Sequence, residues 1–131
     1  MADAFTGEIR MVGFNYPPRG WAFCDGQLLP IAQNTQLFSL LGTKYGGDGA
    51  STFALPDFRG RTPIHQGQGH ILGESGGQEV ETPVSNVAQI PSNPDKPIPA
   101  IFVVGGRPIS VMQPYLTVGF IIALTGLMPP R

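Results

Sequence analysis

Gly20-Trp21-Ala22-Phe23-Cys24-Asp25-Gly26-Gln27-Leu28-Leu29 and Leu55-Pro56-Asp57-Phe58-Arg59-Gly60-Arg61-Thr62-Pro63 are the two stretches that decide the fold. The first predicts a short strand of aromatic and apolar residues that ends at Asp25-Gly26, a pair favoured in tight turns. In the second, Pro56 predicts a tight polar corner, with one arginine on each side of Gly60. Neither stretch has the residue pattern of a catalytic site.

Strands are also expected on both sides of these stretches. From Glu8 to Phe14 the side chains alternate in character, which predicts a strand. Ile98 to Val104 predicts another, closed by two glycines. Between them, the range from Gln66 to Pro99 is rich in Gly, Gln, Ser and Pro and has no periodicity, so irregular or extended structure is expected there.

One short helix is predicted, over Gln36 to Leu41. Its leucines and phenylalanine have the spacing of one apolar helix face. Asn34 or Thr35 is a suitable N-cap, and Gly42 is a suitable residue to end the helix. A helix of about two turns does not persist alone, so tertiary packing must stabilise it.

The composition favours a turn-rich β fold over disorder. The 131 residues include 18 Gly and 14 Pro, but 41% of the chain is hydrophobic and the net charge is only -1. Only 13% of residues are charged, about half the usual share. Interfaces are depleted in charge, so oligomerisation is the natural explanation. Without a Lys/Arg cluster, no nucleic-acid partner is expected.

The segment between Arg107 and Arg131 has no charged residue, which raises the question of a membrane span. Its purely apolar part, Phe120 to Leu124, is far shorter than the ~20 residues that a spanning helix needs. A strand buried on both faces is expected instead, with one face against the domain core and the other against a neighbouring subunit. The residues expected in this interface are Tyr115, Val118, Phe120, Ile122 and Leu124.

Metal binding has little support from a single chain. There are two histidines, His65 and His70, and no Cys or Glu at metal-ligand spacing beside them. Each is expected to be a polar loop residue. In a trimer, one histidine near the three-fold axis would contribute three imidazoles, so both remain weak candidates for such a site. No cofactor is expected.

Catalysis also has little support. Cys24 has no histidine nearby in sequence, and no nucleophile-elbow motif is present. Paired carboxylates could be chosen from Asp25, Asp57, Glu74 and Glu79. However, Asp25 is explained as a turn residue, and Asp57 as a partner of an arginine in its own corner or of local amides. The chain is therefore not expected to be an enzyme.

Two further features have alternative explanations. The loop from Tyr45 to Thr52 resembles a calcium loop in composition, but its single carboxylate, Asp48, is too few ligands, and a plain turn is expected. Trp21 is expected in the core, as strand tryptophans usually are, although an exposed tryptophan could stack on the face of a sugar.

Taken in order, these motifs resemble the phage tail collar domain, which is also found in bacterial microcystin-dependent proteins. The similarity covers Phe5 to about Gly69, and the segment from Met112 to Leu124 is similar to the family's closing strand. The collar motif is represented by Trp21, Cys24, Asp25, Gly26, Pro56, Asp57, Arg59, Gly60 and Arg61. The resemblance implies a compact, mainly β domain with one short α-helix, in a trimeric, fibre-like assembly with strands packed between subunits.

The middle of the chain departs from the family. A histidine-containing motif is replaced by Asn86 to Asn93, which has no histidine, and the large variable insertion of longer relatives is nearly absent. A single domain over 1–131 is expected, with a collar core at 1–70, an irregular arm or loop at 71–99 and closing strands at 100–131.

These observations predict a non-enzymatic structural subunit of a phage-tail-like fibre or of a bacterial surface or filament assembly. It would self-associate through apolar strands, most simply as a homotrimer, and contact other tail proteins. The alternative is a lectin-like adhesin that contacts cell-surface glycans through loops such as Gly46–Thr52 and Gln66–Gly77. The N-terminus lacks signal-peptide features, so synthesis in the cytoplasm and a location on a virion tail or cell surface are expected.

Overall fold

The computed structural model describes residues 3–82, 84–87, 102–105 and 108–131. The chain divides into two units. Unit 1 comprises Met1–Ser75 and Leu116–Arg131, and unit 2 comprises Gly76–Tyr115. The described elements are short antiparallel strands, one α-helix and one 3-10 turn, so the predicted fold class, mainly β with one short helix, is confirmed.

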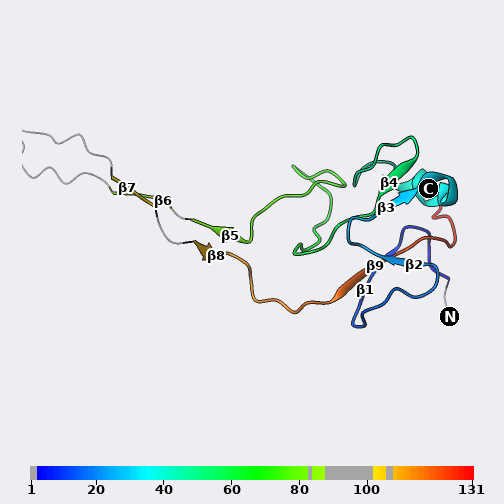
Figure 1. The fold of residues 1–131 in the computed structure, drawn as a ribbon, viewed down its shortest axis with the longest axis horizontal. Helices are drawn as coiled ribbons and strands as arrows, with labels where there is room; N and C mark the ends of the chain where they lie inside the picture. Colours follow the sequence, from blue (N-terminus) through cyan, green and yellow to red (C-terminus); the bar gives the residue numbers. More distant parts are fainter. Residues whose placement is uncertain (1–2, 83, 88–101, 106–107) are drawn as a thin grey trace, which may run out of the picture. The chain divides into compact units, whose positions relative to one another are not determined.

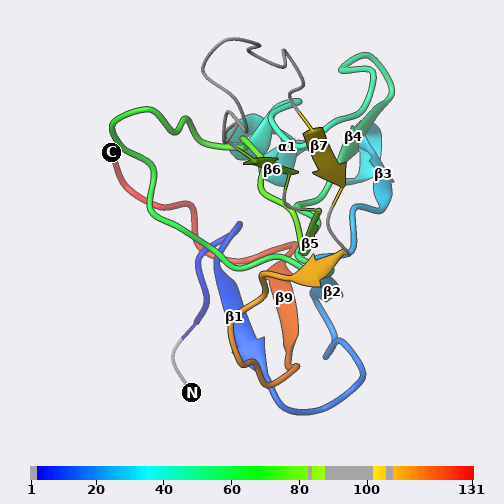
Figure 2. The ribbon, with the colours of Figure 1, turned by 90° about the vertical axis from the view of Figure 1, so that its left-hand side faces the viewer.

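The first sheet of unit 1 joins segments from opposite ends of the chain. It consists of β1 (Ile9–Val12), β9 (Gly119–Ala123) and β2 (Trp21–Phe23), in the order β1-β9-β2. Both pairings are antiparallel, and β1 and β9 lie side by side in Figures 1 and 2. The predicted C-terminal strand is therefore the central strand of this sheet.

β9 is buried on both faces within a single chain. Ile122 stands opposite Ile9 on one side and Ala22 on the other. Ile121, Ile122 and Ala123 are at most 3% exposed, and consecutive strand residues point to opposite faces. Burial on both faces is thus as predicted at these residues, but it needs no neighbouring subunit, because unit 1 itself covers them.

The second sheet of unit 1 is a two-stranded ladder of β3 (Leu28–Pro30) and β4 (Thr52–Ala54). Between these strands the chain forms a 3-10 turn, η1 (Ile31–Gln33), and then α1 (Thr35–Leu41). In the ribbon of Figure 1, α1 lies beside β3 and β4.

The boundaries of α1 agree with the sequence prediction. Asn34 is the N-cap residue, although its side chain donates to the carbonyl of Pro30 (3.0 Å) and accepts no hydrogen bond from a helix amide. Gly42 follows the helix with φ of 56°, a conformation that favours glycine. Leu37 is fully buried, which supplies the tertiary packing that a two-turn helix requires.

The core of unit 1 lies between the two sheets and α1. Phe38 of α1 packs against Phe53 of β4, with ring centroids 5.4 Å apart. The buried residues of this cluster are Ala22, Cys24, Leu37, Phe53, Leu55 and Ile122.

Unit 2 consists of two short antiparallel ladders. One pairs β5 (Val80–Glu81) with β8 (Ile109–Ser110), and the other pairs β6 (Val84–Val87) with β7 (Phe102–Gly105). β5 and β6 fall in the range for which the sequence predicts irregular or extended structure, and they are extended there; their pairing with β8 and β7 was not predicted. β7 overlaps the strand predicted at Ile98 to Val104, whose first residues lie outside the described part.

α1 is too short to cross a bilayer, and the described part of the chain contains no longer apolar helix.

Candidate functional site

The two stretches that carry the sequence signal form one continuous antiparallel pairing. Asp25 and Asp57 are bridge partners, and this pairing continues the register in which Leu28 opposes Ala54 at the start of the β3–β4 ladder. Motifs about thirty residues apart in sequence are thereby brought together into one polar corner, which we call the Asp57 corner and define as residues 25–27 and 57–61.

Backbone hydrogen bonds fix the two sides of this corner. The amide of Phe58 donates to the carbonyl of Cys24 (2.9 Å), and the amide of Gly26 donates to the carbonyl of Pro56 (3.2 Å). Pro56 is buried, as its position in the middle of this pairing requires. Gly26 has φ of 78°, and a Cβ there would lie 3.2 Å from the Cβ of Asp57, so the position favours glycine in both conformation and space.

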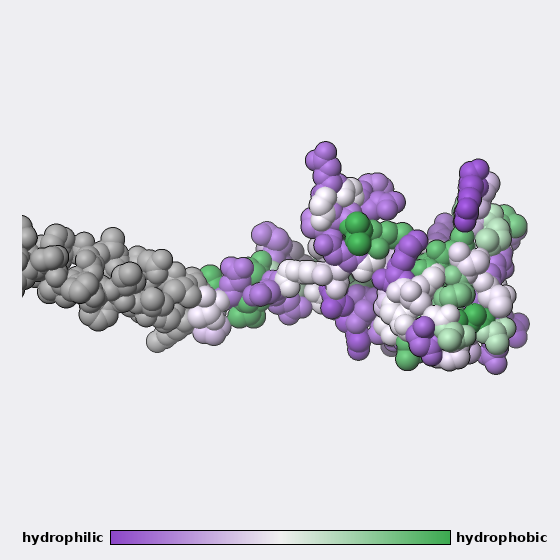
Figure 3. Space-filling view, turned by 90° about the horizontal axis from the view of Figure 1, so that it is seen from above, coloured by the Kyte–Doolittle hydropathy of each residue, from purple (hydrophilic) through white to green (hydrophobic). Residues whose placement is uncertain are grey.

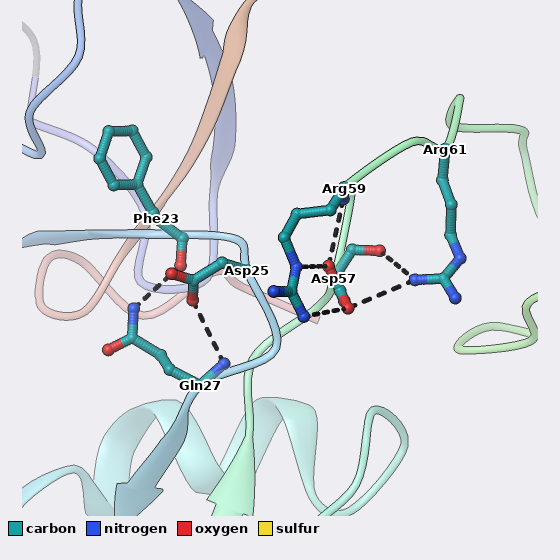
Figure 4. Close-up of polar contacts among 6 residues, drawn as sticks. All are labelled: Phe23, Asp25, Gln27, Asp57, Arg59 and Arg61. Atoms are coloured by element: carbon teal, nitrogen blue, oxygen red, sulfur yellow. Dashed lines mark hydrogen bonds and ion pairs between the residues drawn. The ribbon is translucent and has the colours of Figure 1, made fainter.

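Asp57 is the centre of the corner (Figure 4). The Arg59 guanidinium donates to both carboxylate oxygens, at 2.9 Å from Nε and 3.0 Å from Nη2. Arg61 donates from Nη1 to the Asp57 carbonyl (3.0 Å) and lies 3.4 Å from its carboxylate. The hydrogen bonds from the Arg59 side chain and amide hold the pKa of Asp57 well below its usual range.

Asp25 has a local structural role. Its Oδ1 accepts the amide of Gln27 (3.3 Å), while the Gln27 side chain donates to the carbonyl of Phe23 (3.1 Å). Like charges on paired strand residues are unfavourable. Here the pKa of the Arg59 guanidinium is raised by its hydrogen bond and charge interaction with Asp57 and, to a smaller extent, by the charge of Asp25. The corner therefore uses its carboxylates to hold the backbone and the arginines.

Cys24 is an unreactive core residue. It is almost fully buried, and burial, with a smaller contribution from the charge of Asp25, raises the pKa of its thiol to about 12. The thiolate is the nucleophilic form, so such a thiol is inert at neutral pH.

Trp21 is half-buried rather than a full core residue. The guanidinium carbon of Arg10 lies 4.9 Å from the centroid of its ring, a cation–π contact. Glu8 in turn accepts a 3.0 Å hydrogen bond from Arg10. The indole is thus fixed in place while part of it stays accessible.

The residues predicted to form an oligomer interface differ in how far they are buried. Ile122 is fully buried in unit 1, so its assignment to an interface surface is corrected to the core. Phe120 and Leu124 are partly buried against the same core, and Val118 is 38% exposed. Tyr115, 75% exposed, belongs to unit 2.

An apolar groove on unit 1 contains one of these predicted interface residues. Its volume is about 350 Å³. In the first sheet, Met11 is the register partner of Phe120. Phe120 stacks on Phe58, with ring centroids 4.4 Å apart. The groove is lined by Ile9, Met11, Phe58, Pro63 and Phe120. Sequence reasoning missed Met11 and Pro63, although the alternation along β1 placed Ile9 and Met11 on one face.

The histidines are exposed loop residues, as predicted. Nδ1 of His70 lies 2.9 Å from Oε2 of Glu74. Within the described ranges, no three His, Cys, Asp or Glu side chains gather as a metal site would require. A site on a three-fold axis involves several chains and stays a prediction for His65 and His70.

The loop around Asp48 is a turn organised by its own carboxylate. Oδ1 accepts the amides of Ala50 and Ser51 (both 2.8 Å) and of Thr52 (2.9 Å), and Oδ2 accepts the Ser51 hydroxyl (3.0 Å). These bonds hold the pKa of Asp48 well below its usual range. The carboxylate already serves backbone donors, which supports the predicted turn over a calcium loop.

This geometry defines a small β-rich structural domain in which the carboxylates of the main motif hold the fold. A comparison with protein families agrees, because the model of the Phage Tail Collar Domain matches residues 7–63, a range that contains both sides of the Asp57 corner. Residues 7–63 are therefore similar to the phage tail collar domain. No curated protein matches the chain.

Proposed function

We propose that the chain is a non-enzymatic structural subunit of a phage-tail-like fibre, or of a bacterial surface or filament assembly, and that it self-associates as a homotrimer. The collar domain supports a structural role in a phage tail. In the Asp57 corner, Asp57 serves as the hydrogen-bond acceptor of two arginines and Asp25 as the acceptor of a backbone amide, which are structural roles.

The apolar groove is the observation that carries the proposal of self-association. Met11 is 68% exposed although it lies in the middle of a strand, and the residues that line the groove around it all have apolar side chains. Other hydrophobic side chains also reach the surface of unit 1, where they alternate with polar ones in Figure 3. With 13% charged residues, such a surface is poorly solvated, and an interface of roughly 800 Å² per partner would cover much of it.

Multi-angle light scattering of the purified chain at micromolar concentration tests this proposal. We expect a mass three times the 14.0 kDa of the chain. Electron microscopy of the same sample distinguishes free trimers from fibres. A stable monomer over the whole concentration range would contradict the proposal.

A second candidate function is contact with a cell-surface glycan through exposed loops. Between Gln66 and Gly77 every described residue except Gly73 is exposed. The loop from Gly46 to Thr52 is less suited, because the Asp48 carboxylate is already engaged within the loop. Binding of the labelled protein to whole bacterial cells would support this function if deletion of 66–77 abolished the binding and left assembly intact.

A further inference from the structure

A second hollow on unit 1, distinct from the apolar groove and from the Gln66–Gly77 loop, lies beside Trp21. Its volume is about 360 Å³, at the lower end of the range for small-molecule sites. Residues from both ends of the chain line it. They are Asp3, Ala4, Arg19, Gly20, Trp21, Thr125, Gly126 and Leu127.

Several backbone acceptors of the hollow are already bonded within the protein. The carbonyl of Ala4 accepts the amide of Leu127 (3.0 Å), and the carbonyl of Gly20 accepts the amide of Leu124 (2.8 Å). The carbonyl of Gly126 accepts the side chain of Gln36 (3.3 Å). These bonds make the backbone lining a fixed scaffold and leave side chains as the groups available to a ligand.

The polar side chains of the hollow have no such partners. Arg19, Asp3 and Thr125 form no hydrogen bond or ion pair with any described residue, and the indole N–H of Trp21 makes none either. The two charged residues line the same hollow without pairing with each other. A cation, a carboxylate and a hydroxyl therefore line the same hollow without partners among the described residues.

Two glycines, Gly20 and Gly126, line the hollow. Gly20 has φ of 83°, and a Cβ there would lie 3.5 Å from the Thr125 hydroxyl oxygen. At Gly126 a Cβ would collide with the carbonyl of Ala4, so the chain passes closely here. Two of the segments that line the hollow, at Ala4 and at Gly126, therefore pass close to each other.

Trp21 is held in position from outside the hollow. Arg10, which contacts its ring and is itself bonded to Glu8, does not line the hollow. The residue that contacts the indole ring is thus not one of the residues that line the hollow. An aromatic surface fixed in this way loses little conformational entropy when a ligand stacks on it.

We propose that this hollow binds a neutral pyranose sugar of a glycan. A pyranose has an apolar C–H face that packs on an indole and a rim of hydroxyls that both donate and accept. Arg19 donates to hydroxyl oxygens, Asp3 accepts from hydroxyl hydrogens, and Thr125 does both. The carboxylate of Asp3 disfavours an anionic ligand, which selects a neutral sugar over a phosphate. The proposal rests on the second candidate function, contact with a glycan, but it places the binding site in this hollow rather than in the exposed loops. It does not depend on self-association.

Intrinsic fluorescence gives a direct test, because Trp21 is the single tryptophan of the chain. The full chain is titrated with D-glucose, D-galactose and N-acetyl-D-glucosamine, and with glycerol as a polyol without a ring face. We expect a saturable change in Trp21 emission with at least one sugar, at a dissociation constant on the order of 1–10 mM, and none with glycerol. Saturation-transfer NMR on the same sugars provides a readout that does not depend on the indole.

Two variants test whether the sugar binds in this hollow. Arg19→Ala should weaken binding about tenfold or more, since a hydrogen bond from a charged group is lost, and Thr125→Val should weaken it less. Lys44→Ala removes an exposed cation outside the hollow and should leave binding unchanged. All three positions are exposed, and melting by circular dichroism checks that the variants are folded.

Absence of a saturable response to all three sugars in both readouts would overturn the sugar site, as would equal binding by Arg19→Ala and Lys44→Ala. Neither outcome bears on the oligomeric mass, so failure here is distinguishable from failure of the assembly proposal.

Discussion

A single carboxylate organises the loop between α1 and β4. Asp48 accepts three backbone amides at one oxygen and a hydroxyl at the other, within five residues of chain. Hydrogen bonds to the charged form of a carboxyl group lower its pKa, and here they act without burial. The loop is therefore most stable when Asp48 is ionised.

The stability of the chain should consequently depend on Asp48 in acid. The folded-state pKa is lower than the ordinary value of 3.8, so the stabilisation is fully present above that value. It is lost as the pH falls below 3.8 toward the folded-state pKa. Thermal melting between pH 7 and pH 2 should show a smaller acid-induced decrease in Tm for Asp48→Asn, because the asparagine oxygen still accepts the amides but does not titrate.

Glu79→Gln is the matched control, since Glu79 is exposed and its side chain has no described hydrogen bond. It should keep the acid dependence of the wild-type chain. An unchanged acid dependence in Asp48→Asn would show that the carboxylate does not contribute in this way.

Residues with local partners were the ones that the sequence predicted well. Asp57 is bonded to arginines two and four residues away, and Asp25 to an amide two residues away, so turn chemistry alone placed both. Ile122 has its partners a hundred residues or more away, in β1 and β2. An apolar strand residue has the same sequence pattern in a core as in an interface, and only the register distinguished the two.

At the scale of elements, the Asp48 loop crosses closely over β4. The carbonyl of Gly46 accepts the amide of Ala54 (3.0 Å). A Cβ at Gly47 would lie 2.4 Å from the Cα of Phe53, and Gly47 has φ of 93°. Both the contact and the conformation require glycine at this point.

Gly47→Ala should therefore destabilise unit 1 by about 2–4 kcal/mol, since the loop must move away from β4 and the residue is strained. Urea denaturation followed by circular dichroism measures the change. Gly13→Ala is the control, because a Cβ at Gly13 meets no atom within 4 Å and its φ is not positive. Similar midpoints for the two variants would contradict the close approach of loop and strand.

Elements were predictable where they depend on neighbours in sequence. α1 has an apolar face, a suitable N-cap and a terminal glycine within nine residues, and the sequence placed it correctly. β5 and β6 were missed because the partner of each strand is distant: Val80 pairs with Ser110, and Val84 with Gly105. The Gly- and Gln-rich segment before them has no periodicity, and a two-residue strand is defined by its partner alone.

At the scale of the whole molecule, self-association has to be explained by the surface rather than by the core. Unit 1 covers both faces of β9 by itself, so the low charge of the chain is not explained by a missing half of its core. The groove at Met11 is the part of the exposed apolar surface of unit 1 that forms a hollow. Self-association, if it hides apolar surface, should therefore depend on this groove rather than on Ile122.

Met11→Glu tests this dependence. The side chain is 68% exposed, so a glutamate there stays in water in the monomer and should leave the fold intact. In an assembled interface the same charge would be buried without a partner, which is costly. We expect the association constant to fall about a hundredfold or more, with a shift from trimer toward monomer mass in light scattering.

Tyr16→Glu is the matched control for this variant, because Tyr16 is 61% exposed and does not line the groove. It adds the same charge and should keep the trimer mass. A variant at Ile122 could not serve the purpose, since a charge in the core would unfold unit 1 and abolish any assembly indirectly. A Met11→Glu chain that melts as the wild type and still forms trimers would place the interface elsewhere on the molecule, with the exposed residues of unit 2 the next to be tested.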